Sequence, residues 1–281
     1  MDKFGRSYIL DVKLLDGTTL TIKPPFTIEF DIMRRTLSSA NNSVIKIYNL
    51  SELNRSNLQK NIWNFGALRP ILLRAGYGTN LPIIFKGTIQ RAFSVRQGVN
   101  FITQIEAFDA GFDYVNSKVN KSFPAGVTYS FIIKSLIESF TDVELGFIGD
   151  YPSVTTRGSS YVGNIGDILK NLSDGGFFID NGIANVIHDN ESLQGELELI
   201  DSANGLLGTP RLEENNLIFD MVFEPRVKLG QKITLKSSTA KNFNGVYKVV
   251  SVQHRGTISE SICGEVITSI GQFGHQKNPQ Q

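Results

Sequence analysis

Apolar and polar residues alternate in short runs through the first third of the chain, and turn residues separate the runs. Alternation with a period of two places one side of a strand against a core and the other side in solvent. Asp16-Gly17 favours a tight hairpin turn, and Ser51 is the expected N-cap of a short helix at 51–60. The segments 33–35 (Met-Arg-Arg) and 38–43 are expected in loops. The runs predict strands, enough for a small barrel, at residues 8–15, 18–23, 26–32, 44–48, 69–77, 83–95 and 99–108.

The pattern changes to a helical period in the middle of the chain. Thr128 is a good N-cap for a helix over 128–140, because its apolar residues recur every three or four positions on one face. A second helix is predicted from Asn164, and Gly175-Gly176 is suited to end it in a left-handed conformation. A hairpin follows across Asn181-Gly182, with strands at 177–180 and 184–188. These elements predict a small α+β module.

Strands return in the last third, at residues 196–200, 217–223, 232–236, 246–254 and 258–270. Residues 69–95 and 227–253 share a weak pattern: a strand, a loop, and then a glycine, Gly87 or Gly245, that opens the next strand. This shared pattern suggests that the two β-rich ends are copies of one barrel. We therefore expect a mainly β (α+β) fold, with one barrel at 1–111, an α+β module with two helices at 112–190, and a second barrel at 191–281.

The composition describes a near-neutral globular protein. The chain has 281 residues, and 28 Lys and Arg against 27 Asp and Glu leave a formal charge of +1, so there is no whole-chain attraction to nucleic acid or an anionic membrane. A lone cysteine, Cys263, excludes an internal disulfide, and the 3 histidines add too few ligands for a Cys/His zinc site. The N-terminus lacks a secretory pattern and no apolar run reaches the ~20 residues that cross a bilayer, so folding in a cytosol is expected.

No motif for enzymatic chemistry is complete. Gly76-Tyr77-Gly78 begins like a dinucleotide-binding fingerprint, but Leu81 takes the third glycine position and a strand follows, so a turn is the better interpretation. The serine-hydrolase elbow fails at its last position in the segment 158–162 (GSSYV). His254, at the end of a predicted strand, is the one histidine to test as a general base, although a strand-end histidine bonded to backbone or solvent is the more frequent case.

Two other kinds of site have weak support. A glycosidase needs two carboxylates about 5–9.5 Å apart, and the candidate pairs are Glu196 with Glu198 and Asp109 with Asp113. Such pairs arise easily on solvated faces in a chain with 27 acidic residues. For nucleic acid, the basic residues of 33–35, Arg91 and Arg96 are scattered rather than clustered with aromatics. No catalytic, cofactor-binding or metal-binding residue is therefore assigned, and no cofactor is expected.

Phenylalanine is the unusual component of the chain. The sequence has 19 Phe against 8 Tyr and 1 Trp, and its 20% of charged residues is below the ~25% of average chains. These phenylalanines either fill two or three cores or line subunit interfaces, whose buried centres are rich in aromatics and poor in charge. The sequence leaves both interpretations open.

Several segments, in their order and spacing, resemble the central baseplate hub proteins of contractile-tailed bacteriophages. In the C-terminal part they are IDSANGLLGTP at 200–210, FEP at 223–225, LGQ at 229–231, NGVYKV at 244–249 and HRG at 254–256. In the N-terminal part they are VIKIYNL at 44–50, AGY at 75–77 and FKGTI at 85–89. The similarity covers most of the chain, and its motifs, including the 205–210 segment and the Gly87 and Gly245 turns, are backbone-shaping rather than catalytic.

The resemblance implies a homotrimer in the baseplate of the virion, made in the host cytoplasm. Hubs of this kind carry two tube-type β-barrels per subunit, so three subunits form a ring of six barrels. Such a ring matches the hexameric tail tube, or a tube-initiator protein, on one side and the trimeric central spike on the other, beside other baseplate proteins. Genomic DNA would pass through its channel without specific binding, and no enzymatic activity is implied, since no segment is long enough for a fused lytic domain.

Two other classes of function remain as alternatives. One is a tail-associated peptidoglycan hydrolase, which would use a carboxylate pair such as those above. The other is a β-rich carbohydrate-binding module, which would need exposed aromatics, although Trp63 and 8 Tyr are all that the chain offers besides phenylalanine.

Overall fold

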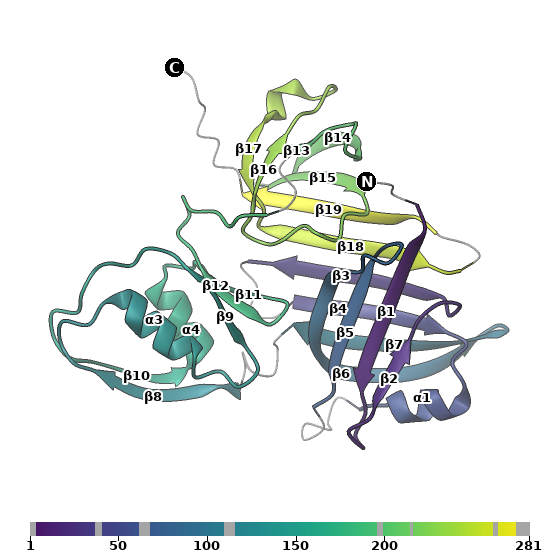
Figure 1. Cartoon of the computed structure of the whole chain (residues 1–281), viewed down its shortest axis with the longest axis horizontal. Coiled ribbons are helices and arrows are strands. Elements are labelled where there is room, and N and C mark those ends of the chain that lie inside the picture. The colour runs from purple at the N-terminus through teal and green to yellow at the C-terminus, as the bar shows by residue number, and fades with distance from the viewer. Residues whose placement is uncertain are drawn as a thin grey trace.

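A computed structural model describes residues 4–36, 41–61, 68–109, 116–195, 199–213, 216–260 and 264–273 of the chain. Strands dominate this structure, and three short helices and one 3-10 turn accompany them in the described residues (Figure 1). The mainly β fold class predicted from the alternation is therefore confirmed.

One large antiparallel sheet contains strands from both ends of the chain. In the described residues it has eleven strands in the order β14-β15-β19-β18-β3-β4-β7-β6-β5-β1-β2. Their bounds are β1 (Arg6–Lys13), β2 (Thr19–Ile22), β3 (Ile28–Arg35), β4 (Asn41–Tyr48), β5 (Pro70–Tyr77), β6 (Ile83–Gln97), β7 (Asn100–Asp109), β14 (Leu206–Glu213), β15 (Asn216–Val222), β18 (Ser251–Ile258) and β19 (Val266–Phe273). The two ends meet where β3 pairs with β18, from Ile28 opposite Ile258 to Arg35 opposite Ser251.

The N-terminal part of this sheet folds over itself along β6. The first half of β6 pairs with β5, and its second half pairs with β7 after a register shift between Ile89 and Arg91. As a result β1, β2 and β5 cross over β3, β4 and β7 (Figure 1). The alternating apolar side chains of both layers, including Leu10, Phe30 and Phe85, fill the first core between them. Helix α1 (Glu52–Leu58) begins where predicted, because Ser51 accepts the Asn54 N–H at 3.3 Å.

The C-terminal part has the same change of direction. There β13 (Leu199–Ile200), β16 (Lys232–Leu235) and β17 (Gly245–Lys248) form a small sheet that stands across β18 and β19 (Figure 1). A 3-10 turn, η1 (Lys241–Phe243), precedes β17. Phe219, Leu235 and Ile270 are among the side chains that build a second apolar cluster between these layers.

The strand order is repeated in the two parts. In the first part, neighbouring strands follow the order β3-β4-β7-β6-β5-β1. In the second part, the order is β14-β15-β19-β18 in the large sheet and β17-β16-β13 in the small sheet. The strands β17 and β18, which are consecutive in the chain, together take the place of β6. A ladder row across the first part joins Asp31, Val44, Glu106 and Arg91. The corresponding row of the second part joins Arg211, Ile218, Gly271 and Ser251. The parts differ in that β13 is parallel to β16 whereas β1 is antiparallel to β5.

The middle of the chain forms an α+β module. Its elements are β8 (Lys118–Phe123), α3 (Tyr129–Ile137), β9 (Glu144–Ile148), β10 (Ser159–Asn164), α4 (Ile165–Leu172), β11 (Phe177–Asp180) and β12 (Ile183–Val186). The predicted cap Thr128 is confirmed, since it accepts the Phe131 N–H at 3.3 Å. Asn164, from which the second helix was predicted, caps α4 by accepting the Asp167 N–H at 3.2 Å. Ile133 and Leu169 lie in a third apolar cluster between the helices and the small sheets.

Several strand predictions need correction. The predicted strand 246–254 is broken, because at Val249 and Val250 the backbone changes partner, from Gln231 to Gly271. The predicted strand 258–270 is not one strand: Ile258 ends β18 and residues 266–270 open β19, and the antiparallel pairing of these two strands requires a reversal between them. Residues 33–35 belong to β3 and residues 41–43 belong to β4, rather than to loops. The strands β8, β9, β10 and β14 were not predicted, and 38–40 lies outside the described residues.

Gly87 lies in the interior of β6 and does not open a strand. A Cβ there would meet the Phe108 carbonyl oxygen and the Phe85 ring, so glycine lets β6 pass close to β7 where the sheet folds over. Gly245 does open β17, as predicted. The helix predicted over 128–140 ends at Ile137, although Phe140 still packs into the core of the module.

Candidate functional site

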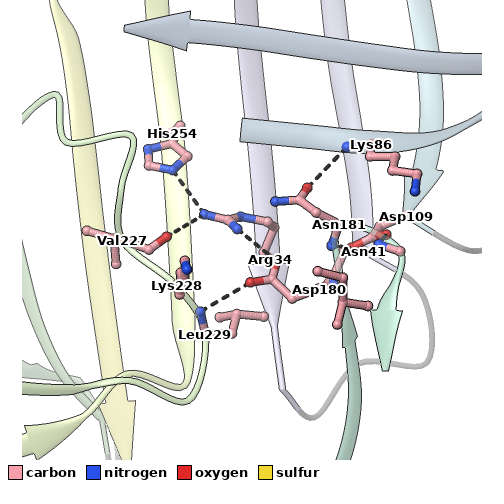
Figure 2. Close-up of polar contacts among 12 residues, drawn as sticks. Arg34, Asn41, Lys86, Asp109, Asp180, Asn181, Val227, Lys228, Leu229 and His254 are labelled. Atoms are coloured by element: carbon pink, nitrogen blue, oxygen red, sulfur yellow. Dashed lines mark hydrogen bonds and ion pairs between the residues drawn. The ribbon is translucent and has the colours of Figure 1, made fainter. Parts of the chain in front are cut away.

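A buried polar cluster fastens the module to the large sheet. The turn of the β11–β12 hairpin enters between the ends of β3 and β7 and the loop before β16 (Figure 2). We call this cluster the joint; it consists of Arg34, Asp109, Asp180, Asn181 and His254. Asn-Gly at the tip allows the tight turn, because Asn181 and Gly182 both have positive φ, at 54° and 79°.

Arg34 is the centre of the joint. It lies on β3 and is only 1% exposed. One guanidinium nitrogen donates to Asp180 Oδ1 at 2.8 Å, and the other donates to the Val227 carbonyl at 3.0 Å and faces His254 Nε2 at 3.2 Å. Because Arg34 is buried and the Asp180 side chain is only 11% exposed, this ion pair connects the hairpin to β3 in a region that water screens weakly.

His254 is neutral in this arrangement. Since a guanidinium only donates, Nε2 of His254 is the acceptor, and the ring proton lies on Nδ1, which donates to Thr268 Oγ1 at 2.9 Å. Burial lowers the pKa of His254 well below its usual value, and the Arg34 charge lowers it further. The His254 imidazole is 0% exposed, and both of its nitrogens are in hydrogen bonds. The histidine named from the sequence as a possible general base therefore contacts no open surface.

Asp109 binds the hairpin turn from the end of β7. Its carboxylate accepts the backbone N–H of Asn181 at 2.9 Å and that of Gly182 at 3.2 Å. Burial raises its pKa to about 7, and the neighbouring Asp180 charge raises it as well, against the opposing effect of those two N–H groups and Arg34. Asp180 itself also accepts the Leu229 N–H at 3.3 Å, and the Asn181 side chain accepts the Lys86 N–H at 3.1 Å.

The other candidates from the sequence lie apart from the joint. Gly76 and Gly78 lie at the end of β5 and in the following turn, which agrees with the turn interpretation. Ser159 and Ser160 are in β10, where Ser160 shares a hydrogen bond with Ser122. Arg91 and Arg96 are on β6 and lie over Phe93 and Phe101. Glu196, Glu198 and Asp113 lie outside the described residues, so neither carboxylate pair is described as a pair.

Sequence reasoning missed the joint as a unit. It identified the hairpin turn and named Asp109 and His254 separately, but assigned Arg34 to a loop. The available signal was the alternation of β3, in which Arg34 occupies the same face as the buried Ile28, Phe30 and Ile32. An arginine at a core position requires a buried acceptor, and Asp180 next to an Asn-Gly turn supplies it.

Besides the outer side of β2, which ends the sheet, two other edge segments of the large sheet have no strand partner in the described residues. One is the second half of β6 beyond Ala92, where Lys60 makes the last bridge. The other is the outer side of β14, whose partner on the inner side is β15. Apolar side chains are exposed at both, with Val95 at 47% and Leu212 at 59%. Unpaired N–H and C=O groups of such edges are suited to pair with another chain.

Two cations on the solvent-facing side of the sheet are paired with carboxylates. Lys46 bonds Glu29 at 2.7 Å, and Arg211 lies 3.4 Å from Asp220, while the neutral Gln253 bonds Asp31 at 2.7 Å. Paired in this way, Lys46 and Arg211 are less available to a phosphate backbone.

A groove of about 690 Å³ lies between β5, β6 and the module, with Pro70, Ile83 and Val143 among its apolar lining residues. No three or more His, Cys, Asp or Glu side chains of the described residues are placed to share a metal ion. None of the helices in the described ranges has the length and apolar character that a bilayer crossing requires.

Comparison with protein families gives one match over most of the chain. The family model described as "Baseplate hub gp41" matches residues 9–257. No significant match to curated protein sequences was found.

Solved structures share the fold at low sequence identity. A tail protein from Neisseria meningitidis MC58 superposes with a TM-score of 0.64 at 10% identity, over 96% of this chain and 97% of that one. The 43 kDa tail protein of prophage MuSo2 from Shewanella oneidensis gives 0.66 at 8% identity, over 95% and 96%. A chain of the lidless PdpA-VgrG complex gives 0.53 at 9% identity, over 96% of this chain and 65% of that one.

Proposed function

Because the chain belongs to the baseplate hub gp41 family, we propose that three copies form a ring that joins the hexameric tail tube to the trimeric central spike of a phage baseplate. In this proposal residues 1–111 and 191–281 are two tube-type barrels, and 112–190 is a module attached to their junction. The protein acts as a structural adaptor and not as an enzyme.

The repeated strand order is the observation that carries the proposal. One chain already joins two similar sheets side by side, through the antiparallel pairing of β3 with β18. Three such chains present six similar sheets, which a sixfold partner can bind on one side while a threefold partner binds the subunits on the other.

The free edges indicate how the ring closes. Because the strand orders correspond, the second half of β6 is the counterpart of β18, and β14 is the counterpart of β3. Both segments lack a further strand partner in the described residues. Pairing β6 of one copy with β14 of the next repeats between subunits the contact that β18 and β3 make within one, and leaves neither of these two edges open once the third copy is added.

The channel is then lined by the solvent-facing side of the sheet, because the cores occupy its other side. Two of its cations, Lys46 and Arg211, are paired with Glu29 and Asp220. Such a surface supports the passage of genomic DNA without specific binding.

The partners and location follow from the same proposal. The ring would contact a tube or tube-initiator protein, the central spike and other baseplate proteins, in a virion assembled in the host cytoplasm. The fold shared with a chain of the PdpA-VgrG complex agrees with a place in an assembly of several proteins.

The mass of the purified protein in solution tests the ring. Light scattering should give about three times the 31.1 kDa of one chain, and images of the particle should show a hole along a threefold axis. A monomer at micromolar concentration, or a particle with twofold symmetry, would contradict the proposal.

A further inference from the structure

The joint buries more negative than positive charge. Around the hairpin turn, β3 contributes Arg34, β7 contributes Asp109, β11 contributes Asp180, and β18 contributes the neutral His254. The remaining charged groups nearby are engaged or turned outward: Lys86 Nζ bonds Glu144, Glu224 bonds Arg226, and Lys228 is exposed. Two carboxylates therefore lie near one guanidinium in a site where Arg34 and Asp109 are buried and the Asp180 side chain is only 11% exposed.

Two buried carboxylates beside a single cation are costly to ionise together, because their repulsion is not screened. We propose that Asp109 carries a proton while the hairpin is docked, and that release of this proton to solvent loosens the hairpin from the sheet. The joint is then a pH-sensitive latch between the module and the two halves of the large sheet. This inference concerns a single chain and does not depend on the ring.

Asp109 is the member of the pair that carries the proton. Asp180 has the Arg34 guanidinium at 2.8 Å, which stabilises its ionised form. Asp109 has backbone N–H groups but no cation of its own, and burial with the neighbouring Asp180 charge raises its pKa to about 7. When the hairpin leaves, Asp109 meets water, and its pKa returns towards the ordinary value of about 3.9.

The direction of the pH effect follows from this difference. A carboxyl group with a raised pKa in the docked state favours docking while it is protonated, and this contribution is lost as the pH rises from about 4 through about 7. His254 does not oppose the effect locally. Its ring contacts Thr268 and Phe223, which belong to the sheet side of the joint and stay when the hairpin opens.

Hydrogen exchange of the hairpin amides tests the latch on the full chain. For Asn181 and Gly182, after correction for base catalysis, the opening constant should rise about tenfold per pH unit between pH 5 and pH 7 and then level off, as loss of one proton requires. Asp109→Asn removes the titrating group, so its opening constant should not vary with pH. Glu138→Gln, which changes an exposed carboxylate at the end of α3, should keep the wild-type profile.

A second measurement covers the case in which Asp109→Asn does not fold. The carboxyl carbon of Asp109 in the unaltered protein, followed by NMR, should titrate near neutral pH. Titration of Asp109 below pH 5 would overturn the proposal, and so would an opening constant of the wild type that does not change with pH.

Discussion

Arg34 occupies the apolar side of β3, where the alternation of Ile28, Phe30 and Ile32 leads to a hydrophobic position. Its charge is tolerated there because Asp180, the Val227 carbonyl and His254 accept hydrogen bonds from its guanidinium group. All three partners are remote in sequence, so the residue connects β3 to the module and to the C-terminal part at one point. Removing one partner of such a pair leaves the other charge buried without compensation.

Arg34→Met tests this role, because methionine keeps the apolar stem and removes the charge. The free energy of unfolding should fall by about 3–5 kcal/mol, as for other broken buried pairs. Arg74→Met is the matched control, since Arg74 bonds Asp11 at the same distance of 2.8 Å but both side chains are partly exposed. Its loss should be about 0–1 kcal/mol. Equal losses in urea unfolding of the two variants would contradict the role given to Arg34.

At the scale of elements, the β11–β12 hairpin combines a local signal with a long-range contact. Asn181 and Gly182 adopt positive φ because the two-residue turn requires it, and this could be predicted from the sequence. The turn then places two backbone N–H groups against Asp109 and one side-chain oxygen against the Lys86 N–H. The same dipeptide therefore both forms the hairpin and docks it.

Gly182→Ala separates these two contributions when it is compared with Gly98→Ala. Gly98 also has positive φ, at 61°, and has open space around it, so alanine there should cost about 1–2 kcal/mol of unfolding free energy from backbone strain alone. At Gly182 a Cβ would also lie 3.3 Å from the Lys86 side chain, which bonds Glu144. The loss at Gly182 should exceed that at Gly98 by up to about 1 kcal/mol. A smaller loss at Gly182 in chemical denaturation would show that the turn has room to adjust.

At the scale of the whole molecule, the decisive contact joins β3 to β18, more than two hundred residues apart in the chain. Asp31 lies opposite Arg255 in this pairing. Because the ladder rows of the two parts correspond, Val95 on β6 occupies the position that Arg255 has on β18. Arg211 on β14 likewise occupies the position that Asp31 has on β3. If β6 and β14 pair between subunits, Val95 and Arg211 of neighbouring copies face each other.

Cysteines at these positions test the contact, in a background where Cys263 is replaced by serine. Val95→Cys with Arg211→Cys should give disulfide-linked dimers and trimers on a non-reducing gel, because opposed residues of antiparallel strands are within disulfide reach. Asp31→Cys with Arg255→Cys is the matched control and should cross-link within one chain, without a gain in mass. A particle of trimer mass that does not cross-link would refute this edge contact alone, whereas a monomer would refute the ring.

The parts of the fold that could be predicted are those with local causes. Ser51, Thr128 and Asn164 cap their helices through hydrogen bonds that span three residues, so their sequence signals are complete in themselves. The break at Val249 and Val250 could not be predicted in this way. It exists because the backbone changes partner from Gln231 to Gly271, and no property of the two valines encodes that change.

The joint was predictable only in part for the same reason. The hairpin turn was visible in the sequence, but its docking depends on Arg34 of β3 and Asp109 of β7 meeting it across the fold. The pairing of β3 with β18 brings these elements and His254 together, and single-sequence patterns carry no information on which strand edges meet.

The hairpin fills only the junction that lies inside a subunit, between β3 and β18, and the described chain has no second hairpin for the junction between β6 and β14. In the proposed ring, junctions that hold a hairpin would therefore alternate around the circumference with junctions that hold none. A partner protein that contacts only the strands would have six equivalent binding sites, whereas a partner that contacts the hairpins would have three. Two proteins stacked on opposite faces of the same annulus could thus differ in rotational order without either deforming it.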